Sequence, residues 1–157
     1  SGALENLVGE AIKGELESSI SQSVTASEGI INVTSSKEFE ATYQSLKTII
    51  SGNENLSILA ELDHQANAQS RGLELRSTKI IIFGNPNLGT PLMQESQSIG
   101  LYLPQKILVG KDADGKVHLS YNDPEFLKLR HGINESDEEI QQISNALQNI
   151  SEAAAAN

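Results

Sequence analysis

"KIIIFGNPNLGTPLM", residues 79–93, decides the fold, because here an apolar run passes into a segment with two glycines and two prolines. The isoleucines predict a buried strand. Proline fits the first turn of a helix but not its interior. A helix therefore begins either at Pro91, with Thr90 as its N-cap, or at Pro86, with Asn85 as its N-cap and a restart at Pro91. In both cases the segment predicts a strand, a tight connection and a helix.

The connection Asn85–Met93 is also the first candidate binding site. With either helix start, we expect backbone N–H groups near Gly89 and Thr90 to point out of a helix N-terminus, where an anion is stabilised. Glycine also lets a ligand approach the backbone closely. The segment matches neither glycine-rich phosphate motif, since no lysine follows the second glycine and the spacing G-x-G-x-x-G is absent. A turn with good capping residues explains the same letters equally well.

Hydrophobic periodicity and turn residues around this segment predict further strands and helices. The predicted elements are a helix at 3–24, a strand at 29–35, a helix at 35–52, a strand at 56–64, a short helix at 64–71, a strand ending at 83, a hairpin at 105–122, a helix at 124–132 and a last helix after Ser136. Asp63 is expected to cap the short helix, and Ser136 with Glu139 forms a capping box for the last one. In that last helix, Ile143 and Leu147 are expected to face the core. Within the strand at 56–64, one face is predicted to hold Leu56, Ile58, Ala60, Leu62 and His64.

The fold class that these elements predict is α+β, with two layers. Helices are expected to pack on one face of a mainly antiparallel mixed sheet, in the order β-α-β-β-α-β-β-α with an extra N-terminal helix. The chain of 157 residues is long enough for one domain with its own core. We predict an N-terminal amphipathic helical arm at 1–28, a single α+β domain at 29–152 and a flexible tail at 153–157.

Composition limits the classes of partner. The formal net charge is -10, from 21 acidic and 11 basic residues, and no basic stripe is present. Because phosphate contacts dominate nucleic-acid affinity, we expect no nucleic-acid binding, and an anionic membrane surface is disfavoured for the same reason. The opening letters SGALENL include no methionine and no visible signal peptide. We expect a soluble protein of unassigned compartment, cytoplasmic or exported after removal of a signal absent from this chain.

His64 is the main candidate for acid–base chemistry, because it ends an apolar strand and begins the short helix. A helix N-terminus disfavours imidazolium, so a neutral imidazole is expected there. A buried histidine bonded to the backbone fits the same position. Of the other histidines, His118 is expected on a solvated strand face, and His131 at a helix C-terminus, where a cation is favoured.

No metal and no cofactor are expected. The chain has no cysteine, and no two histidines stand three or four residues apart. The turn DADG at 112–115 lacks the later acidic ligands of a calcium loop and predicts a hairpin turn.

Four blocks of the sequence resemble one known family. They are ELDHQANAQSRGLEL, IIIFGNPNLGTPLMQ, GLYLPQKILVGKDADGKVHLSYNDP and RHGI. Over residues 29–133 they are similar to the bacterial and archaeal domain-of-unknown-function family 302. The resemblance implies a compact α+β domain that often pairs as a homodimer, and it implies no settled activity. The motif residues that match by position, without a catalytic role, are His64, Asn85, Pro86, Gly89, Thr90, Met93, Tyr121, Asn122 and Pro124.

The chain departs from the family pattern at two positions. Tyr102 stands where the family usually has an acidic residue, and Gly110 stands where it usually has an aromatic residue. If these positions line a cleft, its chemistry differs in this chain.

Three functions follow as hypotheses. The first is a small-ligand-binding domain for a small anionic molecule at the Asn85–Met93 connection. The second is an enzyme that uses His64 as a general base and the same amides as an oxyanion site. The third is an interaction protein that assembles through its N-terminal helix. The predicted ligand-binding residues, which are expected to converge, are His64, Asn85, Gly89, Thr90, Met93, Tyr121 and Asn122.

Overall fold

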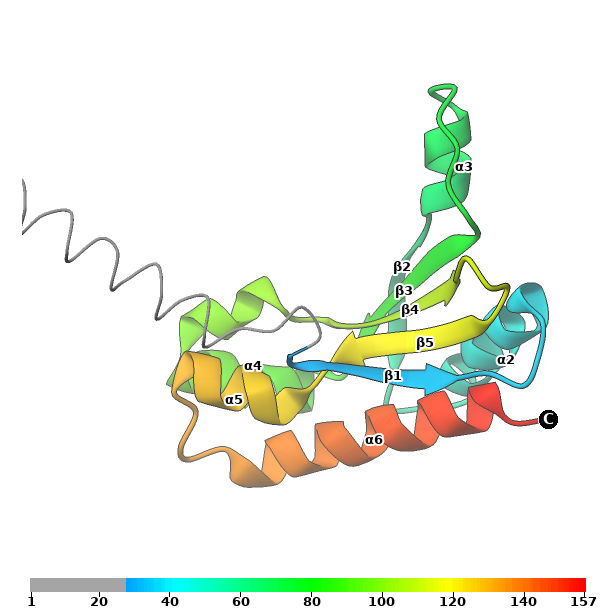
Figure 1. Ribbon diagram of the computed structural model, residues 1–157. Coiled ribbons are helices and arrows are strands. Elements are labelled where there is room, and N and C mark those ends of the chain that lie inside the picture. Colours follow the sequence, from blue (N-terminus) through cyan, green and yellow to red (C-terminus); the bar gives the residue numbers. More distant parts are fainter. Residues whose placement is uncertain (1–27) are drawn as a thin grey trace, which may run out of the picture.

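The computed structural model describes residues 28–157 and shows a twisted sheet with helices along one face (Figure 1). The elements are β1 (Ile30–Thr34), α2 (Phe39–Ser51), β2 (Ser57–Asp63), α3 (His64–Gln69), β3 (Thr78–Gly84), α4 (Pro86–Glu95), η1 (Gln97–Leu101), β4 (Gln105–Lys111), β5 (Val117–Asn122), α5 (Pro124–His131) and α6 (Asp137–Ala155). The predicted N-terminal helical arm falls on residues outside this described part. The predicted order omitted two helices, α3 and α5, although both segments were expected to be helical.

The sheet has five strands in the order β1-β5-β4-β3-β2. Every neighbouring pair is antiparallel, so the predicted antiparallel character is confirmed and the mixed sheet is wrong. A parallel pair needs a long crossover connection. Here β4 turns back directly into β5, β2 and β3 are joined by residues 64–77, and β1 lies beside β5 in the opposite direction.

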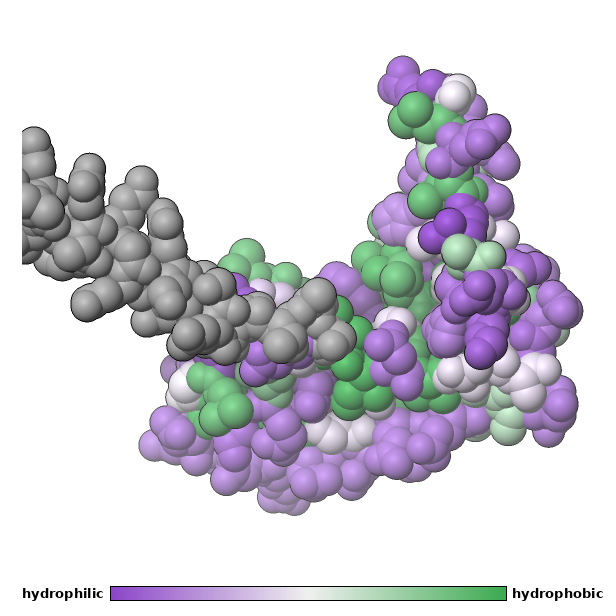
Figure 2. All heavy atoms as spheres, in the orientation of Figure 1, coloured by the Kyte–Doolittle hydropathy of each residue, from purple (hydrophilic) through white to green (hydrophobic). Residues whose placement is uncertain are grey.

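The core lies between one face of the sheet and the helices α2 and α6. Alternate residues of the central strands point into it, as expected for strands with one buried face. Each of the following is fully buried: Leu46, Ile50, Ile81, Ile107, Val109 and Leu119. The opposite face carries no helix in the described part, and hydrophobic side chains remain visible between the arm and the helical layer (Figure 2). By strand register Leu62 and Ile30 lie on this open face, and they are 44% and 45% exposed.

Strand β2 contains a bulge that breaks the predicted alternation. Ile58 pairs with Phe83, but the next paired residue is Ala60, opposite Ile82. Because Phe83 and Ile82 lie on opposite faces of β3, Ile58 and Ala60 also lie on opposite faces. The expectation that one face holds Ile58, Ala60 and Leu62 is therefore wrong. The extra residue is Leu59, which is 62% exposed.

The chain between β2 and β3 forms an arm that projects beyond the sheet (Figure 1). Its helix α3 starts where Asp63 caps it, since the Asp63 carboxylate accepts a hydrogen bond from the Ala66 amide at 2.9 Å. This confirms the predicted cap. The segment of the arm that leads back to β3 exposes Leu73 and Leu75.

Helix α6 is the longest helix in the described part of the chain. It runs to Ala155, and both Ala154 and Ala155 are buried. The Ser36 amide donates to the Ala155 carbonyl at 2.9 Å, which ties this end to the start of α2. The predicted flexible tail from residue 153 is therefore wrong up to Ala155, because alanine favours helix and this turn packs on the core. No helix between residues 28 and 157 has the length and apolar character needed to cross a bilayer.

Candidate apolar binding site

A cavity of about 330 Å³ lies at the end of the sheet where β3 passes into α4. Helix α6 and the segment before β4 close its other sides. Among the described residues that line it there is no charged side chain. The lining residues are Leu56, Ser57, Leu59, Phe83, Gly84, Asn85, Pro86, Leu88, Gly89, Thr90, Met93, Leu103, Pro104, Gln105, Ile143, Ala146 and Leu147. The site is therefore an apolar hollow with a few neutral polar groups.

Asn85 and Pro86 set the direction of α4 along this cavity. The Asn85 side chain accepts a hydrogen bond from the Asn87 amide at 3.0 Å and caps the helix, and Pro86 occupies the first turn. Pro91 lies inside the same helix, which continues past it. Of the two predicted starts, the earlier one at Pro86 is confirmed, and there is no separate start at Pro91.

The expectation that the backbone N–H groups near Gly89 and Thr90 are free is wrong. The Leu88 and Gly89 amides both donate to the Asn85 carbonyl, at 3.0 and 3.1 Å. Thr90 lies inside α4. Because the helix begins several residues before Gly89, these N–H groups point back into the helix instead of out of its N-terminus. The connection does not form the amide cradle that an anion would need.

Four of the predicted ligand-binding residues do lie together. Asn85, Gly89, Thr90 and Met93 all line the cavity from α4. A Cβ atom placed on Gly89 would lie 3.6 Å from Leu103 Cδ1, an ordinary van der Waals contact, so the glycine leaves this small space to the cavity. The Leu103–Pro104 peptide bond in that wall is cis.

His64 lies at the other end of the sheet. In the pair β2–β3, Ser57 faces Gly84 while Asp63 faces Lys79. At about 3.3 Å per residue, these two ends of β2 are about 20 Å apart. The predicted convergence of His64 with the Asn85–Met93 connection is therefore wrong, because β2 runs antiparallel to β3 and carries His64 away from it.

Tyr121 and Asn122 lie at the same end of the sheet as the cavity, but they are not among the residues that line it. Tyr121 is 5% exposed and belongs to the core, and burial raises the pKa of its hydroxyl. Asn122 pairs with Ile30 on β1 and points to the opposite face from Tyr121. The predicted set is thus divided among the cavity, the core, the open face of the sheet and the base of the arm.

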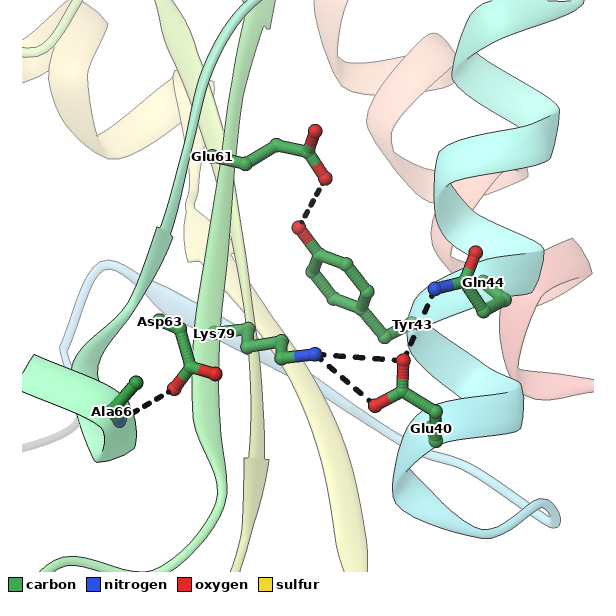
Figure 3. Close-up of polar contacts among 7 residues, drawn as sticks. All are labelled: Glu40, Tyr43, Gln44, Glu61, Asp63, Ala66 and Lys79. Carbon is green, nitrogen blue, oxygen red and sulfur yellow. Dashed lines mark hydrogen bonds and ion pairs between the residues drawn. The ribbon is translucent and has the colours of Figure 1, made fainter. Parts of the chain in front are cut away.

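Polar side chains near the base of the arm join α2 to the sheet (Figure 3). The Tyr43 hydroxyl donates to Glu61 Oε1 at 2.6 Å, and Lys79 Nζ pairs with Glu40 at 3.1 Å. Lys79 Nζ also lies 4.8 Å from the centre of the Tyr43 ring, within reach of a cation–π interaction. The hydrogen bond from Tyr43, together with Lys47, lowers the pKa of the Glu61 carboxyl. This cluster fixes helix α2 and forms no hollow.

We expect Tyr43→Phe to lower the free energy of unfolding by about 1–2 kcal/mol at neutral pH, since it removes a hydrogen bond to a carboxylate. The folded-state pKa of Glu61 is lowered, so its stabilising contribution is present above the unfolded-state pKa and is lost as pH falls through the folded-state value. The difference between the two proteins should therefore shrink below about pH 4. Urea unfolding of the wild type and of Tyr43→Phe, at neutral pH and below about pH 4, measures this difference in the free energy of unfolding. Tyr102→Phe is the control. A difference that persists unchanged in acid would contradict this linkage.

The residues that sequence reasoning missed are those on the far walls of the cavity. Leu103 and Pro104 come from the segment before β4, and Ile143 and Leu147 come from α6. Helical periodicity identified the last two as core residues. No local pattern could show that these distant segments leave a space between them.

Comparison with known proteins agrees with this fold. Residues 31–153 match the family described as "Domain of unknown function DUF302". A crystal structure of an uncharacterized conserved DUF302 protein from Bacillus stearothermophilus superposes with a TM-score of 0.71 at 19% sequence identity. The match covers 81% of this chain and 98% of that one, and at this identity it shows a shared fold alone.

Two curated relatives are named as fluoride channels. The chain is 46% identical over 78 residues to "Fluoride-specific ion channel FluC 1" of Brucella suis biovar 1 (strain 1330), and equally to "Fluoride-specific ion channel FluC 2" of Brucella melitensis biotype 1. Each match covers 50% of this chain but only 31% and 29% of the relative. The chain thus spans less than a third of these relatives. The match over residues 31–153, together with the five-stranded fold, shows that the chain belongs to the DUF302 family.

Proposed function

We propose that this domain binds a small molecule with a mainly apolar body in the cavity between β2, β3, α4 and α6. The observation that carries the proposal is the lining: leucine, isoleucine, phenylalanine, methionine and proline side chains surround a hollow of about 330 Å³. Typical small-molecule sites have volumes of about 300–1,000 Å³ and combine apolar walls with few polar groups. An aliphatic chain of moderate length or a single aromatic ring suits this size.

The polar side chains of the lining favour an uncharged hydrogen-bonding group on that ligand. They are those of Ser57, Asn85, Thr90 and Gln105. A carboxylate would lose its hydration in this cavity, where no described side chain carries a positive charge to compensate. The anionic ligand that the sequence suggested is therefore the competing outcome of the test.

The other two hypotheses draw less support from the geometry. An enzyme with His64 as base would need that imidazole beside the amides of α4, about 20 Å away along β2. Assembly through the N-terminal helix concerns residues outside the described part. Homodimer formation remains a prediction, which the mass of the protein in solution tests directly.

A thermal-shift titration with matched probes tests the proposed ligand class. We expect 1-octanol to raise the melting temperature more than octanoate, which has the same chain length but carries a charge. Sodium fluoride is included because the relatives are named as fluoride-specific ion channels. Stabilisation by octanoate or fluoride without stabilisation by 1-octanol would contradict the apolar, uncharged ligand.

Filling the cavity should remove the effect. Ala146 lies on α6 in the lining, so we expect Ala146→Phe to abolish the shift produced by 1-octanol. Ala153→Phe makes the same change at an exposed position of the same helix and should keep that shift. Equal shifts in the two variants would place the bound molecule outside this cavity.

A further inference from the structure

A second hollow, of about 480 Å³, lies on the open face of the sheet, away from the apolar cavity. Unlike the first, it is lined in part by charged side chains, those of Lys111 and Asp112. Its lining residues are Asn32, Thr34, Leu108, Gly110, Lys111, Asp112, His118 and Ser120. They come from β1, β4 and β5, three neighbouring strands of the sheet.

Three of these side chains form a hydrogen-bonded chain. His118 Nε2 lies 2.9 Å from Asp112 Oδ2, and His118 Nδ1 lies 3.2 Å from Thr34 Oγ1. A carboxylate can only accept, so Nε2 carries the hydrogen. In the neutral imidazole Nδ1 then has a free lone pair, which can accept from the Thr34 hydroxyl. This is the order of hydroxyl, imidazole and carboxylate that activates a nucleophile. The sequence predicted only a solvated His118.

Two backbone amides hold the Asp112 side chain in place. Its Oδ1 atom accepts hydrogen bonds from the Asp114 and Lys116 amides, each at 2.9 Å, inside the β4–β5 turn. The hydrogen bond from His118, followed by these amides, lowers the pKa of the Asp112 carboxyl. The carboxylate therefore stays ionised and holds the imidazole in one tautomer and one orientation.

Gly110 makes room in front of His118. The two residues face each other in the register of β4 and β5. A Cβ atom placed on Gly110 would meet no atom within 4 Å, so a side chain at this position would project into the hollow. Glycine leaves the imidazole and the hydroxyl accessible to a small substrate.

Asn32 supplies a polar group on the other side of the hollow. Its side-chain oxygen accepts a hydrogen bond from the Ser120 hydroxyl, which leaves the amide N–H₂ as the donor end. Asn32 and Thr34 are two residues apart on β1 and therefore share the open face. An amide donor at this position is suited to an oxygen that becomes negative during a reaction.

We propose that this hollow is an ester-hydrolysing site in which Thr34 is the nucleophile and His118 the general base. Thr34 Oγ1 forms a bond to the carbonyl carbon of a small ester while its proton passes to His118 Nδ1. The bond from that carbon to the leaving oxygen then breaks, and the leaving group takes the proton from His118. Water attacks the acyl-threonine in the same way, which releases the carboxylic acid and restores the Thr34 hydroxyl. Asp112 positions His118, and Asn32 binds the carbonyl oxygen.

Hydrolysis of p-nitrophenyl acetate by the full chain tests this site. General-base catalysis typically contributes about 10²–10⁴-fold, so we expect Thr34→Val and His118→Gln to lower turnover about 100-fold or more. Thr34→Ser keeps a hydroxyl and should lose less turnover than Thr34→Val. Gly110→Tyr keeps all three hydrogen-bonded side chains and should still lower turnover, because its ring fills the hollow. Thermal unfolding of each variant confirms that it is folded.

Two controls and one covalent readout separate this site from adventitious acetylation. Thr78→Val lies in the same row of the open face, and His131→Gln removes a histidine elsewhere, so both should turn over the ester like the wild type. After rapid acid quenching, peptide mapping of the wild type should find the acetyl group on Thr34. Acetylation confined to lysines, or unchanged turnover in folded His118→Gln, would overturn the proposal.

Discussion

Phe83→Ala is expected to lower the free energy of unfolding by about 3–5 kcal/mol, the usual cost of deleting a buried aromatic side chain. Phe83 is 2% exposed and sits where the core meets the apolar cavity. Its removal takes away apolar contact area and also enlarges the cavity, because the strands on both sides of β3 hold the backbone in place. Urea unfolding at neutral pH measures the change.

Ile80→Ala is the matched control for this prediction. It lies on the same strand but on the opposite, open face, where it is only half-buried. We expect a smaller loss of stability there. An apolar probe such as indole should restore part of the stability of Phe83→Ala by filling the new space. A larger loss of stability in Ile80→Ala than in Phe83→Ala would contradict the placement of the core on the face of the sheet that holds Phe83.

Gly29→Ala is expected to cost about 2–5 kcal/mol, from two separate causes. The backbone of Gly29 has φ of 76°, a left-handed conformation that costs other residues about 1–2 kcal/mol. A Cβ atom there would lie 2.5 Å from the Phe126 ring of α5, so the ring would have to move, which adds about 1–3 kcal/mol of overpacking. The Gly29 carbonyl also accepts from the Asp123 amide at 2.8 Å, which fixes the backbone beside α5.

Gly72→Ala separates the two causes. Gly72 has φ of 72°, but a Cβ atom there meets nothing within 4 Å. Only the conformational cost is therefore expected at this position. In the Phe126→Ala background, Gly29→Ala should cost no more than Gly72→Ala does, since the overlapping ring is gone. Equal costs of the two glycine substitutions in the wild-type background would show that the Phe126 ring moves freely.

Local sequence patterns predicted most of the fold because most of its elements are determined by residues that are close together in the sequence. The β4–β5 hairpin follows from strand alternation around a turn with glycine, and Gly115 there has a positive φ. The start of α3 follows from Asp63, and the start of α4 from Asn85 with Pro86. Each of these predictions depends on a few adjacent residues, and each is confirmed.

The predictions that failed depend on distant residues. A Ser136–Glu139 pattern does not cap α6 through its side chain. Instead Glu95, at the end of α4, accepts hydrogen bonds from the Asn134 and Glu135 amides just before that helix. The order of the strands, which separates His64 from the α4 connection, is also a long-range property. For this reason sequence reasoning found one wall of the apolar cavity and misplaced the histidine.

The bulge at Leu59 has a consequence for the behaviour of whole molecules in concentrated solution. Strand β2 is a border of the sheet, and the backbone groups along such a border are a template onto which a strand of another chain can add. The irregular spacing at Leu59 interrupts that template. We therefore expect deletion of Leu59, which would restore regular spacing, to promote fibril formation, measurable by thioflavin T fluorescence. Leu59, the extra residue of the bulge, thus lines the apolar cavity and also keeps this border of the sheet from pairing with strands of other chains.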